Sequence, residues 1–312
     1  MPGEIPEWLH VHPDVADALL SDRPVVALES TVITHGLPRP VNLDLARWME
    51  TEVISVGVQP ATVAIMDGVV RLGLSNEELE NLALAKEVHK ISRRDLATAV
   101  ARRQTGGTTV AATIFISHAI GIQVFATGGI GGVHRGATGD ISADLPELAR
   151  TPIAVVCSGA KAILDLPRTI EWLETESVPV IGWGTDEFPA FFSRESGLPV
   201  STSLTTLAEI VTFLRSHWRM GIGSGVLICV PCPEEAAVPR ETAEEAIAQA
   251  EMDAQKSNIT GNELTPYLLS RLAELTEGST LRANLELLKN NAHVAATIAK
   301  ALTYNKKPSR KL

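Results

Sequence analysis

Short runs of apolar, often β-branched residues alternate with longer segments of helical periodicity, and this alternation constrains the fold more than any other feature of the sequence. The expected strands are Val25–Leu28, Thr62–Met66, Gln123–Ala126, Ile153–Cys157, Val178–Ile181 and Val226–Val230. The helical patterns between them are Val41–Val56, Ser75–Lys86, Thr108–Ala119, Leu166–Glu176 and Leu204–Met220. The alternation predicts an α/β fold, layered α/β/α, with a largely parallel central sheet. Because the strands are apolar almost throughout, both faces of the sheet should be covered.

The C-terminal part of the chain is almost wholly helical in its pattern, with expected helices at Glu234–Lys256, Thr265–Thr276 and Leu281–Leu302. No Gly/Ser linker separates these helices from the last strand. We therefore expect one α/β domain over residues 23–303 with a helical C-terminal layer. Residues 1–22 are expected to form an N-terminal arm, and the basic residues 304–312 a frayed tail.

Charge and composition exclude several classes of protein. Lys and Arg number 27 against 37 Asp and Glu, and the resulting net charge of -10 would repel a nucleic-acid backbone. No apolar run approaches the ~18 residues of a membrane span, and the acidic N-terminus lacks the apolar core of a signal peptide. Three cysteines cannot form a disulfide framework, which fits a reducing compartment. We expect a cytoplasmic protein that binds neither nucleic acid nor membrane.

Ligands of open α/β sheets collect beyond the carboxyl ends of the strands, so the residues that follow the strands are of most interest. Lys161 follows Ile153–Cys157 through three small residues, in what we expect to be a tight strand-to-helix turn. A partly desolvated amine near a helix N-terminus is a candidate nucleophile toward a carbonyl carbon. The alternative is a lysine that caps a surface turn.

Glu29 ends the first expected strand, behind an apolar run. A partly desolvated carboxyl group can hold a proton near neutrality and act as a general acid. The alternative is a carboxylate that pairs with an arginine at the rim of the sheet.

A glycine-rich stretch, Thr127–His134, follows the third expected strand but lacks the third glycine of a dinucleotide fingerprint. It is either a loop whose N–H groups cradle an anion or a plain flexible turn. Asp140 lies in the loop beyond it and suits a hard, water-rich divalent cation, or else stabilises a turn. Asp144 begins Asp144-Leu145-Pro146-Glu147, the pattern of a capping box, which makes it an expected helix N-cap.

Two further polar groups stand out. Lys90, Arg93 and Arg94 form a cationic cluster that suits a phosphate monoester or serves surface salt bridges. Asn284 and Asn291 are seven residues apart on one face of the last expected helix. Their amides could contact the hydrogen-bonding edge of a ligand or form packing bonds between helices.

Cys229-Val230-Pro231-Cys232 has the C-x-x-C spacing of a redox pair or half a zinc site. No second cysteine pair exists, so two small apolar residues at a strand end are the alternative.

Taken together, these segments resemble the pseudouridine-5'-phosphate glycosidases. The matching stretches run from Ala27 to Ala292 and include ALESTVITHGLPRP, KISRRDL, GGTTVAAT, VFATGGIGGVHRGA, DISADL, CSGAKAILDLPRTIEWLET, GTDEFPAFF and LRANLELLKNNA. The resemblance implies an α/β/α enzyme that reversibly cleaves the C–C glycosidic bond of pseudouridine 5'-phosphate to uracil and ribose 5-phosphate. It also implies one divalent cation per subunit, usually Mn²⁺, a homotrimer, and a pseudouridine kinase of the ribokinase type as pathway partner.

The resemblance also implies roles for individual residues. Lys161 looks like the nucleophile that forms a Schiff base with the ring-opened sugar, Glu29 like the proton donor and Asp140 like the metal ligand. The implied substrate contacts are Lys90, Val110 (through its backbone), Ser142, Ala143, Asp144 and Asn284.

One corner departs from the family, which usually has Ala-Asn-Pro-Ile-Pro where this chain has Cys229-Val230-Pro231-Cys232-Pro233. The missing amide at Val230 puts local polar contacts in doubt. Two other functions compete: a Schiff-base aldolase or lyase that uses Lys161 on another phosphosugar, and a redox or metal module built on Cys229 and Cys232.

Overall fold

The fold is taken from a computed structural model that describes residues 5–136, 139–259 and 264–304. The strands are β1 (Leu9–Val11), β2 (Val25–Leu28), β3 (Gln59–Met66), β4 (Val69–Leu72), β5 (His89–Ile91), β6 (Gly106–Thr108), β7 (Val124–Ala126), β8 (Val133–His134), β9 (Ala154–Cys157), β10 (Leu164–Asp165), β11 (Val180–Trp183), β12 (Thr202–Leu204) and β13 (Val226–Cys229).

The helices are α1 (Pro13–Leu20), α2 (Val41–Ser55), α3 (Asn76–Leu84), α4 (Leu96–Ala101), α5 (Val110–Ala119), α6 (Asp144–Arg150), α7 (Leu166–Thr175), α8 (Leu207–Arg219), α9 (Arg240–Lys256), α10 (Leu264–Leu275) and α11 (Ser279–Tyr304). A π-helical turn, η1 (Val32–Gly36), follows β2, and a 3-10 turn, η2 (Arg93–Asp95), follows β5.

The main sheet has 11 strands, nine of them in the order β1-β4-β3-β2-β7-β9-β13-β11-β12. From β3 through β12 every neighbouring pair is parallel. At the other side β4 is antiparallel to β3, and β6 pairs with both β3 and β5. The carboxyl ends of the central strands therefore meet at one edge of the sheet, where the chemistry is expected.

The predicted fold class is confirmed. All six expected strands form, as β2, β3, β7, β9, β11 and β13, and all six lie next to one another in the parallel part of the sheet. β2, β9 and β13 are buried along their whole length, as their apolar sequences predict. Short strands such as β6, with its sequence Gly-Gly-Thr, carry no comparable pattern and were not expected.

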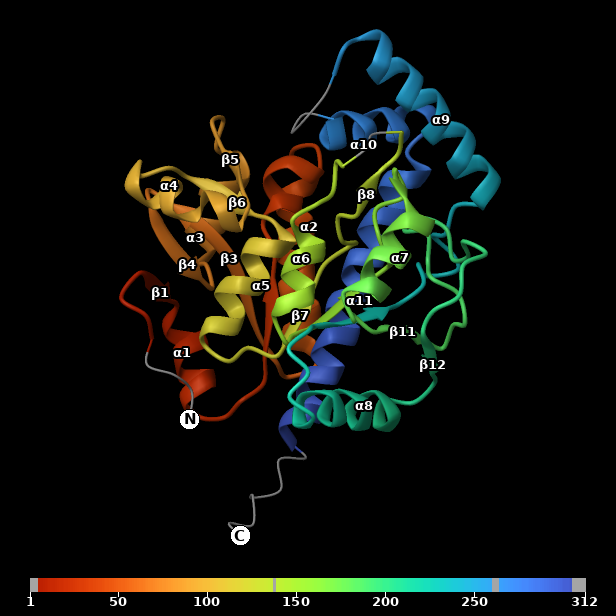
Figure 1. Cartoon of the computed structure of the whole chain (residues 1–312). Helices are drawn as coiled ribbons and strands as arrows, with labels where there is room; N and C mark the ends of the chain where they lie inside the picture. Colours follow the sequence, from red (N-terminus) through yellow and green to blue (C-terminus); the bar gives the residue numbers. More distant parts are fainter. Residues whose placement is uncertain (1–4, 137–138, 260–263, 305–312) are drawn as a thin grey trace.

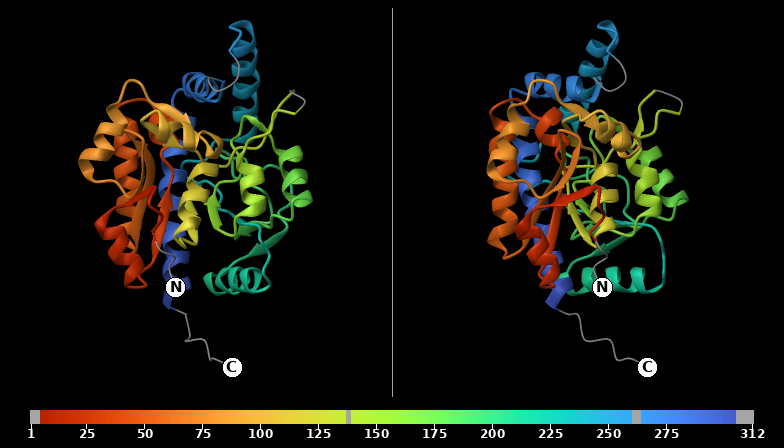
Figure 2. Two further views of the ribbon diagram at one scale, coloured as in Figure 1. Left: turned by 60° about the vertical axis from the view of Figure 1, so that its left-hand side comes forward. Right: turned by 90° about the vertical axis from the view of Figure 1, so that its left-hand side faces the viewer.

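Helices cover both faces of the sheet (Figure 1). α2 and α11 pack together on one face, where α11 also contacts β2, β7 and β9, while α5 and α6 lie on the other face (Figure 2). Of the helices expected at the C-terminus, only α11 belongs to a face layer. α9 and α10 pack against each other beyond the edge of the sheet (Figure 2), and α10 also contacts η1 and α11.

The segment expected as an N-terminal arm contributes to the sheet in its described residues. β1 pairs with β4, and Leu9, Val15 and Ala18 are buried in the main hydrophobic core. Of the expected basic tail, residues 305–312 lie outside the described part of the chain. Among the described residues, no helix combines the length and the hydropathy needed to span a bilayer.

Candidate active site

A cavity of about 350 Å³ opens at the carboxyl edge of the sheet, between the sheet, η1, α6 and α10. It brings together all nine residues to which the family resemblance assigns a catalytic, metal-binding or substrate-binding role: Glu29, Lys90, Val110, Asp140, Ser142, Ala143, Asp144, Lys161 and Asn284. These residues are spread over more than 250 positions of the chain, so only the fold makes them neighbours.

Lys161 lies in the loop after β9. Its Nζ donates a hydrogen bond to the carbonyl of Gly129, at 2.7 Å, and its own N–H donates to Ile130. The expected strand-to-helix turn is wrong, because β10 intervenes and α7 begins only at Leu166. The amine is therefore oriented by the glycine-rich loop, and α7 begins five residues beyond it.

Glu29 directly follows β2 and is only 6% exposed. Its carboxyl group accepts a short hydrogen bond from the hydroxyl of Thr127, rather than pairing with the arginine considered from the sequence. Burial raises the pKa of Glu29, and the positive charge of Lys161 and the Thr127 hydrogen bond oppose this rise. A carboxyl group in this environment keeps its proton to higher pH than a free glutamic acid.

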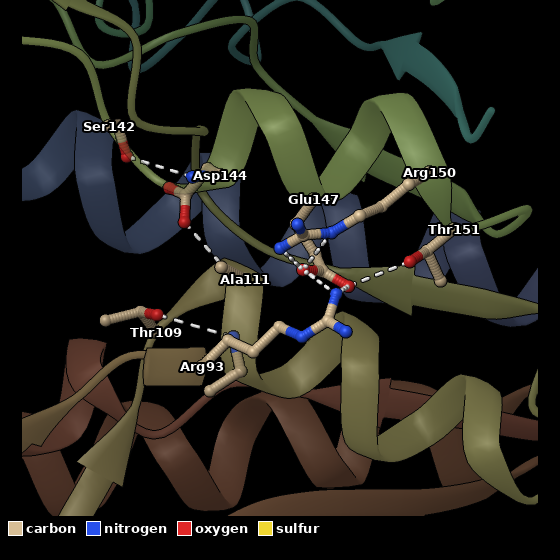
Figure 3. A network of polar contacts seen from close by, with 9 residues as sticks. Arg93, Thr109, Ala111, Ser142, Asp144, Glu147, Arg150 and Thr151 are labelled. Carbon is tan, nitrogen blue, oxygen red and sulfur yellow. Dashed lines mark hydrogen bonds and ion pairs between the residues drawn. The ribbon is translucent and has the colours of Figure 1, made fainter. Parts of the chain in front are cut away.

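Asp144 is the first residue of α6, and its expected N-cap role is wrong: the N-cap position belongs to Ala143, without a side-chain hydrogen bond. The Asp144 carboxylate instead accepts a hydrogen bond from the backbone N–H of Ala111 (2.9 Å; Figure 3) and another from the N–H of Gly131 (2.8 Å). It thereby ties the N-terminus of α5, where Val110 is the first helical residue, to the glycine-rich loop.

The glycine-rich loop is fixed in place and is not a flexible turn. The N–H groups of Ile130 and Gly131 donate to Gly159 and Asp144, so these two amides are not available to cradle an anion. A Cβ on Gly131 would lie 2.2 Å from the Ser142 hydroxyl, which explains the glycine at this position.

The cationic cluster is divided. Arg93 turns away from the cavity and pairs with buried Glu147, while Arg94 is exposed beside Asp95. Lys90 and Arg94 both line the cavity, but of these two only Lys90 is half-buried, and burial, followed by the nearby charge of Lys161, lowers its pKa. Arg93 is therefore not part of the expected phosphate site, which retains two of the three cations.

The two asparagines of α11 have different surroundings. Asn291 is fully buried and donates to the carbonyl of Thr127 (2.9 Å), with a further bond between its Oδ1 and the hydroxyl of Ser158. Asn284 lines the cavity, and its buried Oδ1 has no hydrogen-bond partner among the described residues. A buried acceptor without a hydrogen-bond partner lowers the stability of the ligand-free protein, and a ligand with an N–H donor could satisfy it.

The C-x-x-C cysteines do not form a site. Cys229 lies opposite Cys157 in the neighbouring strand, and burial raises its pKa well above the ordinary value. Burial likewise raises the pKa of Cys232 to about 12. No group of three or more His, Cys, Asp or Glu residues that could hold a metal occurs in the described part of the chain. These thiols are packing residues, which contradicts the redox or metal module.

The structure adds cavity residues that sequence reasoning missed. His35 of η1 bonds through Nδ1 to the Thr34 hydroxyl (2.7 Å), and burial lowers its pKa. Phe191 adopts a positive φ of 64° and packs its ring against Gly129. Both residues lie in stretches that match the family, THG and AFF, and this match could have indicated them as site residues. Pro266 and Leu269 of α10 complete the wall and carried no signal in sequence.

The model of the family described as "Indigoidine synthase A like protein" matches residues 14–301. A pseudouridine-5'-phosphate glycosidase of Solibacter usitatus is 54% identical over 93% of this chain and 98% of its own length. The enzyme of that name from Caldanaerobacter subterraneus is 51% identical over 94% and 96%. The chain belongs to the pseudouridine-5'-phosphate glycosidase family.

Two solved structures of relatives share the family fold. The prealnumycin C-glycosynthase AlnA, crystallised in complex with ribulose 5-phosphate, superposes with a TM-score of 0.88 at 40% identity, covering 96% of this chain and 98% of its own. An indigoidine synthase A-like protein from Thermotoga maritima gives 0.87 at 37% identity, covering 95% and 96%.

Proposed function

We propose that the protein is a pseudouridine-5'-phosphate glycosidase, which converts pseudouridine 5'-phosphate and water reversibly to uracil and ribose 5-phosphate. The observation that carries the proposal is the presence of an amine, Lys161, and a buried carboxyl group, Glu29, at the wall of one cavity. The names of relatives about half identical over nearly the whole chain support it. The C-glycosynthase neighbour further supports an enzyme that acts on a C-glycoside.

Lys161 is proposed as the nucleophile. A C–C bond to a pyrimidine offers no heteroatom leaving group, so the sugar carbon needs an electron donor while the uracil carbon keeps the electrons of the bond and takes a proton. The Nζ of Lys161 bonds to C1′ as the ring oxygen leaves, and its lone pair forms the C1′=N bond of a Schiff base as the C–C bond breaks. Water then hydrolyses the Schiff base, which releases ribose 5-phosphate and the free amine. The carbonyl of Gly129 orients Nζ at 2.7 Å.

Glu29 is proposed as the proton donor to the uracil carbon that leaves the sugar. A general acid must hold its proton at the working pH, and the raised pKa of Glu29 supports this role. In the synthetic direction the same carboxylate takes the proton back.

The proposed substrate contacts fit the polarity of the cavity wall. Lys90 offers a cation to the phosphosugar, and Val110 offers the backbone of the first turn of α5, whose N-terminus favours an anion. Asn284 offers a buried acceptor to an N–H group of uracil. Ser142, Ala143 and Asp144 form the opposite wall.

Asp140 is proposed as the protein ligand of one divalent cation, Mn²⁺. Its carboxylate lines the cavity, and the described residues offer no three-ligand cluster of the kind zinc prefers. A single carboxylate suits a hard cation that keeps most of its waters. The bound ion would supply positive charge that helps to hold the phosphosugar.

From the family resemblance and from composition we further propose a homotrimer, a pseudouridine kinase as pathway partner and a cytoplasmic location.

The decisive experiment incubates the protein with uracil, ribose 5-phosphate and Mn²⁺ and identifies the product by mass spectrometry. A coupled product with the mass and fragmentation of a C-nucleotide is expected. Coupling of other aromatic acceptors but not uracil would point to a glycosynthase, and cleavage of phosphosugars alone to an aldolase. Either result would contradict the proposal.

A further inference from the structure

Glu147 is a fully buried carboxylate that lies outside the cavity lining, and Figure 3 shows the polar groups around it. It accepts hydrogen bonds from Nη1 of Arg93 (3.0 and 2.7 Å), from Nε and Nη2 of Arg150 (3.1 and 2.6 Å) and from the Thr151 hydroxyl (2.8 Å). A buried carboxylate requires such partners, because transfer of an unpaired charge from water into the protein interior has a very large free-energy cost.

The partners of Glu147 differ in what they connect. Arg150 and Thr151 follow it within four residues, at the end of the same helix, α6. Arg93 comes from η2, 54 positions earlier, and its guanidinium also packs over the ring of Phe115 in α5, 4.4 Å from the centroid. Of these three partners, only Arg93 joins α6 to other parts of the fold.

Both ends of the Arg93–Glu147 pair lie next to cavity residues. Lys90, Ser92 and Arg94 flank Arg93 in sequence and line the cavity. Asp144 lies one turn before Glu147 on α6, three residues away and therefore on the same side of the helix. Its carboxylate holds two amides, one at the start of α5 and one in the glycine-rich loop.

We propose that the Arg93–Glu147 ion pair positions the active site. It fixes the Lys90 segment against α6 and so keeps the Asp144 carboxylate on the amides of Ala111 and Gly131. This inference rests on the proposed function for the identity of the substrate. Misplacement of a binding wall by about 1 Å can cost about a hundredfold in rate, so a contact outside the cavity can control the chemistry within it.

The test compares Arg93→Gln with Arg150→Gln in the full chain. Both variants remove a cation from Glu147, but only the first removes the connection between segments. Hydrogen exchange of the Ala111 and Gly131 amides is measured against amides of β13, which report global stability. KM and kcat for pseudouridine 5'-phosphate, and ribose 5-phosphate affinity by calorimetry, are measured in parallel.

Arg93→Gln is expected to raise exchange at the two amides about tenfold without raising it in β13, and to lower ribose 5-phosphate affinity and kcat/KM by about tenfold or more. Arg150→Gln should change each quantity less than about threefold. Equal effects of the two variants, or a uniform rise that includes β13, would overturn the proposal, since both indicate a purely structural pair.

Arg93→Lys supplies a milder variant, because it keeps a charge opposite Glu147 if the glutamine variant does not fold. Exchange at Ala111 and Gly131 should lie between wild type and Arg93→Gln, about threefold above wild type, since an ammonium lacks the planar contact with Phe115. Exchange equal to wild type would show that a cation opposite Glu147 is enough to hold the two amides, whereas an equal rise in β13 would contradict the proposal. Because exchange needs no substrate, a wild-type protein inactive on pseudouridine 5'-phosphate would refute the proposed function and leave this comparison decisive.

Discussion

Lys161 and Lys90 both line the cavity, so an experiment can decide which of the two amines is the nucleophile. We expect borohydride with ribose 5-phosphate to trap a stable adduct on Lys161, since the Gly129 carbonyl orients its Nζ. Lys161→Ala should fold, form no adduct and show no turnover. Lys90→Ala serves as the matched control and should still be labelled at Lys161. Peptide mapping checks the position, and an adduct elsewhere in an active enzyme would disprove this role.

Glu29 should make both activity and stability depend on pH. Burial raises its pKa in the folded protein, so the folded state binds more protons than the unfolded state above the ordinary value of 4.5. The contribution of Glu29 to stability is therefore present at low pH and is lost as pH rises through the folded pKa. Cleavage should decline over the same interval, because the acid must be protonated.

Glu29→Gln separates these two effects. It should lower kcat by about a hundredfold or more and remove part of the fall in stability between low and high pH. Thermal unfolding from pH 5 to 9, with wild type alongside, is the measurement. A wild-type stability profile in Glu29→Gln would show that the carboxyl group is not buried in the folded state as described.

Asp140 carries the prediction on the metal. Chelation should abolish turnover, Mn²⁺ should restore it, and Asp140→Ala should weaken Mn²⁺ binding in calorimetry. Asp186→Ala, an exposed loop aspartate outside the cavity lining, is the control and should bind as wild type does. Undiminished activity of the chelated enzyme, or a preference for zinc, would remove Asp140 from this role.

At the scale of elements, sequence patterns predict the strands that are buried on both faces. They do not predict side-chain roles that depend on contacts with residues far away in the sequence. The apolar runs of β2, β9 and β13 report burial on both sheet faces, so these strands could be found. The Asp144 capping pattern misled because two amides from distant segments outcompete those of its own helix. Nothing local could reveal that Arg93 pairs with Glu147, 54 positions away.

The end of β13 holds the stretch that differs from the pattern implied by the family resemblance. Val230 is 5% exposed, belongs to the hydrophobic core and lies outside the cavity lining, while its N–H donates to the Cys157 carbonyl (2.8 Å). The usual asparagine should therefore brace this corner and take no part in the chemistry. Val230→Asn should change kcat/KM by less than about tenfold, or about 1.4 kcal/mol. A gain of about a hundredfold would show instead that the amide serves catalysis.

At the scale of the whole molecule, α11 connects the sheet to the cavity. It crosses one face of the sheet against β2, β7 and β9 (Figure 1). It carries Asn284 at the cavity wall and Asn291 two turns further on. Asn291 donates to Thr127, whose hydroxyl binds Glu29, and bonds to Ser158, which precedes Lys161 by three residues. One buried amide thus braces the loops that carry both proposed catalytic groups.

Asn291→Ala should therefore lower stability and activity together. Loss of its hydrogen bonds leaves buried polar groups without this partner, at a cost of about 2 kcal/mol in the free energy of unfolding. Because the loops after β7 and β9 both lose their brace, kcat should also fall by about tenfold or more. Asn290→Ala, one position away and partly exposed, is the matched control and should cost less than about 0.5 kcal/mol. Urea unfolding and steady-state kinetics check both variants. If Asn291→Ala is destabilised but keeps the wild-type kcat, the amide contributes to stability alone, since the loops then hold Lys161 and Glu29 in place without it.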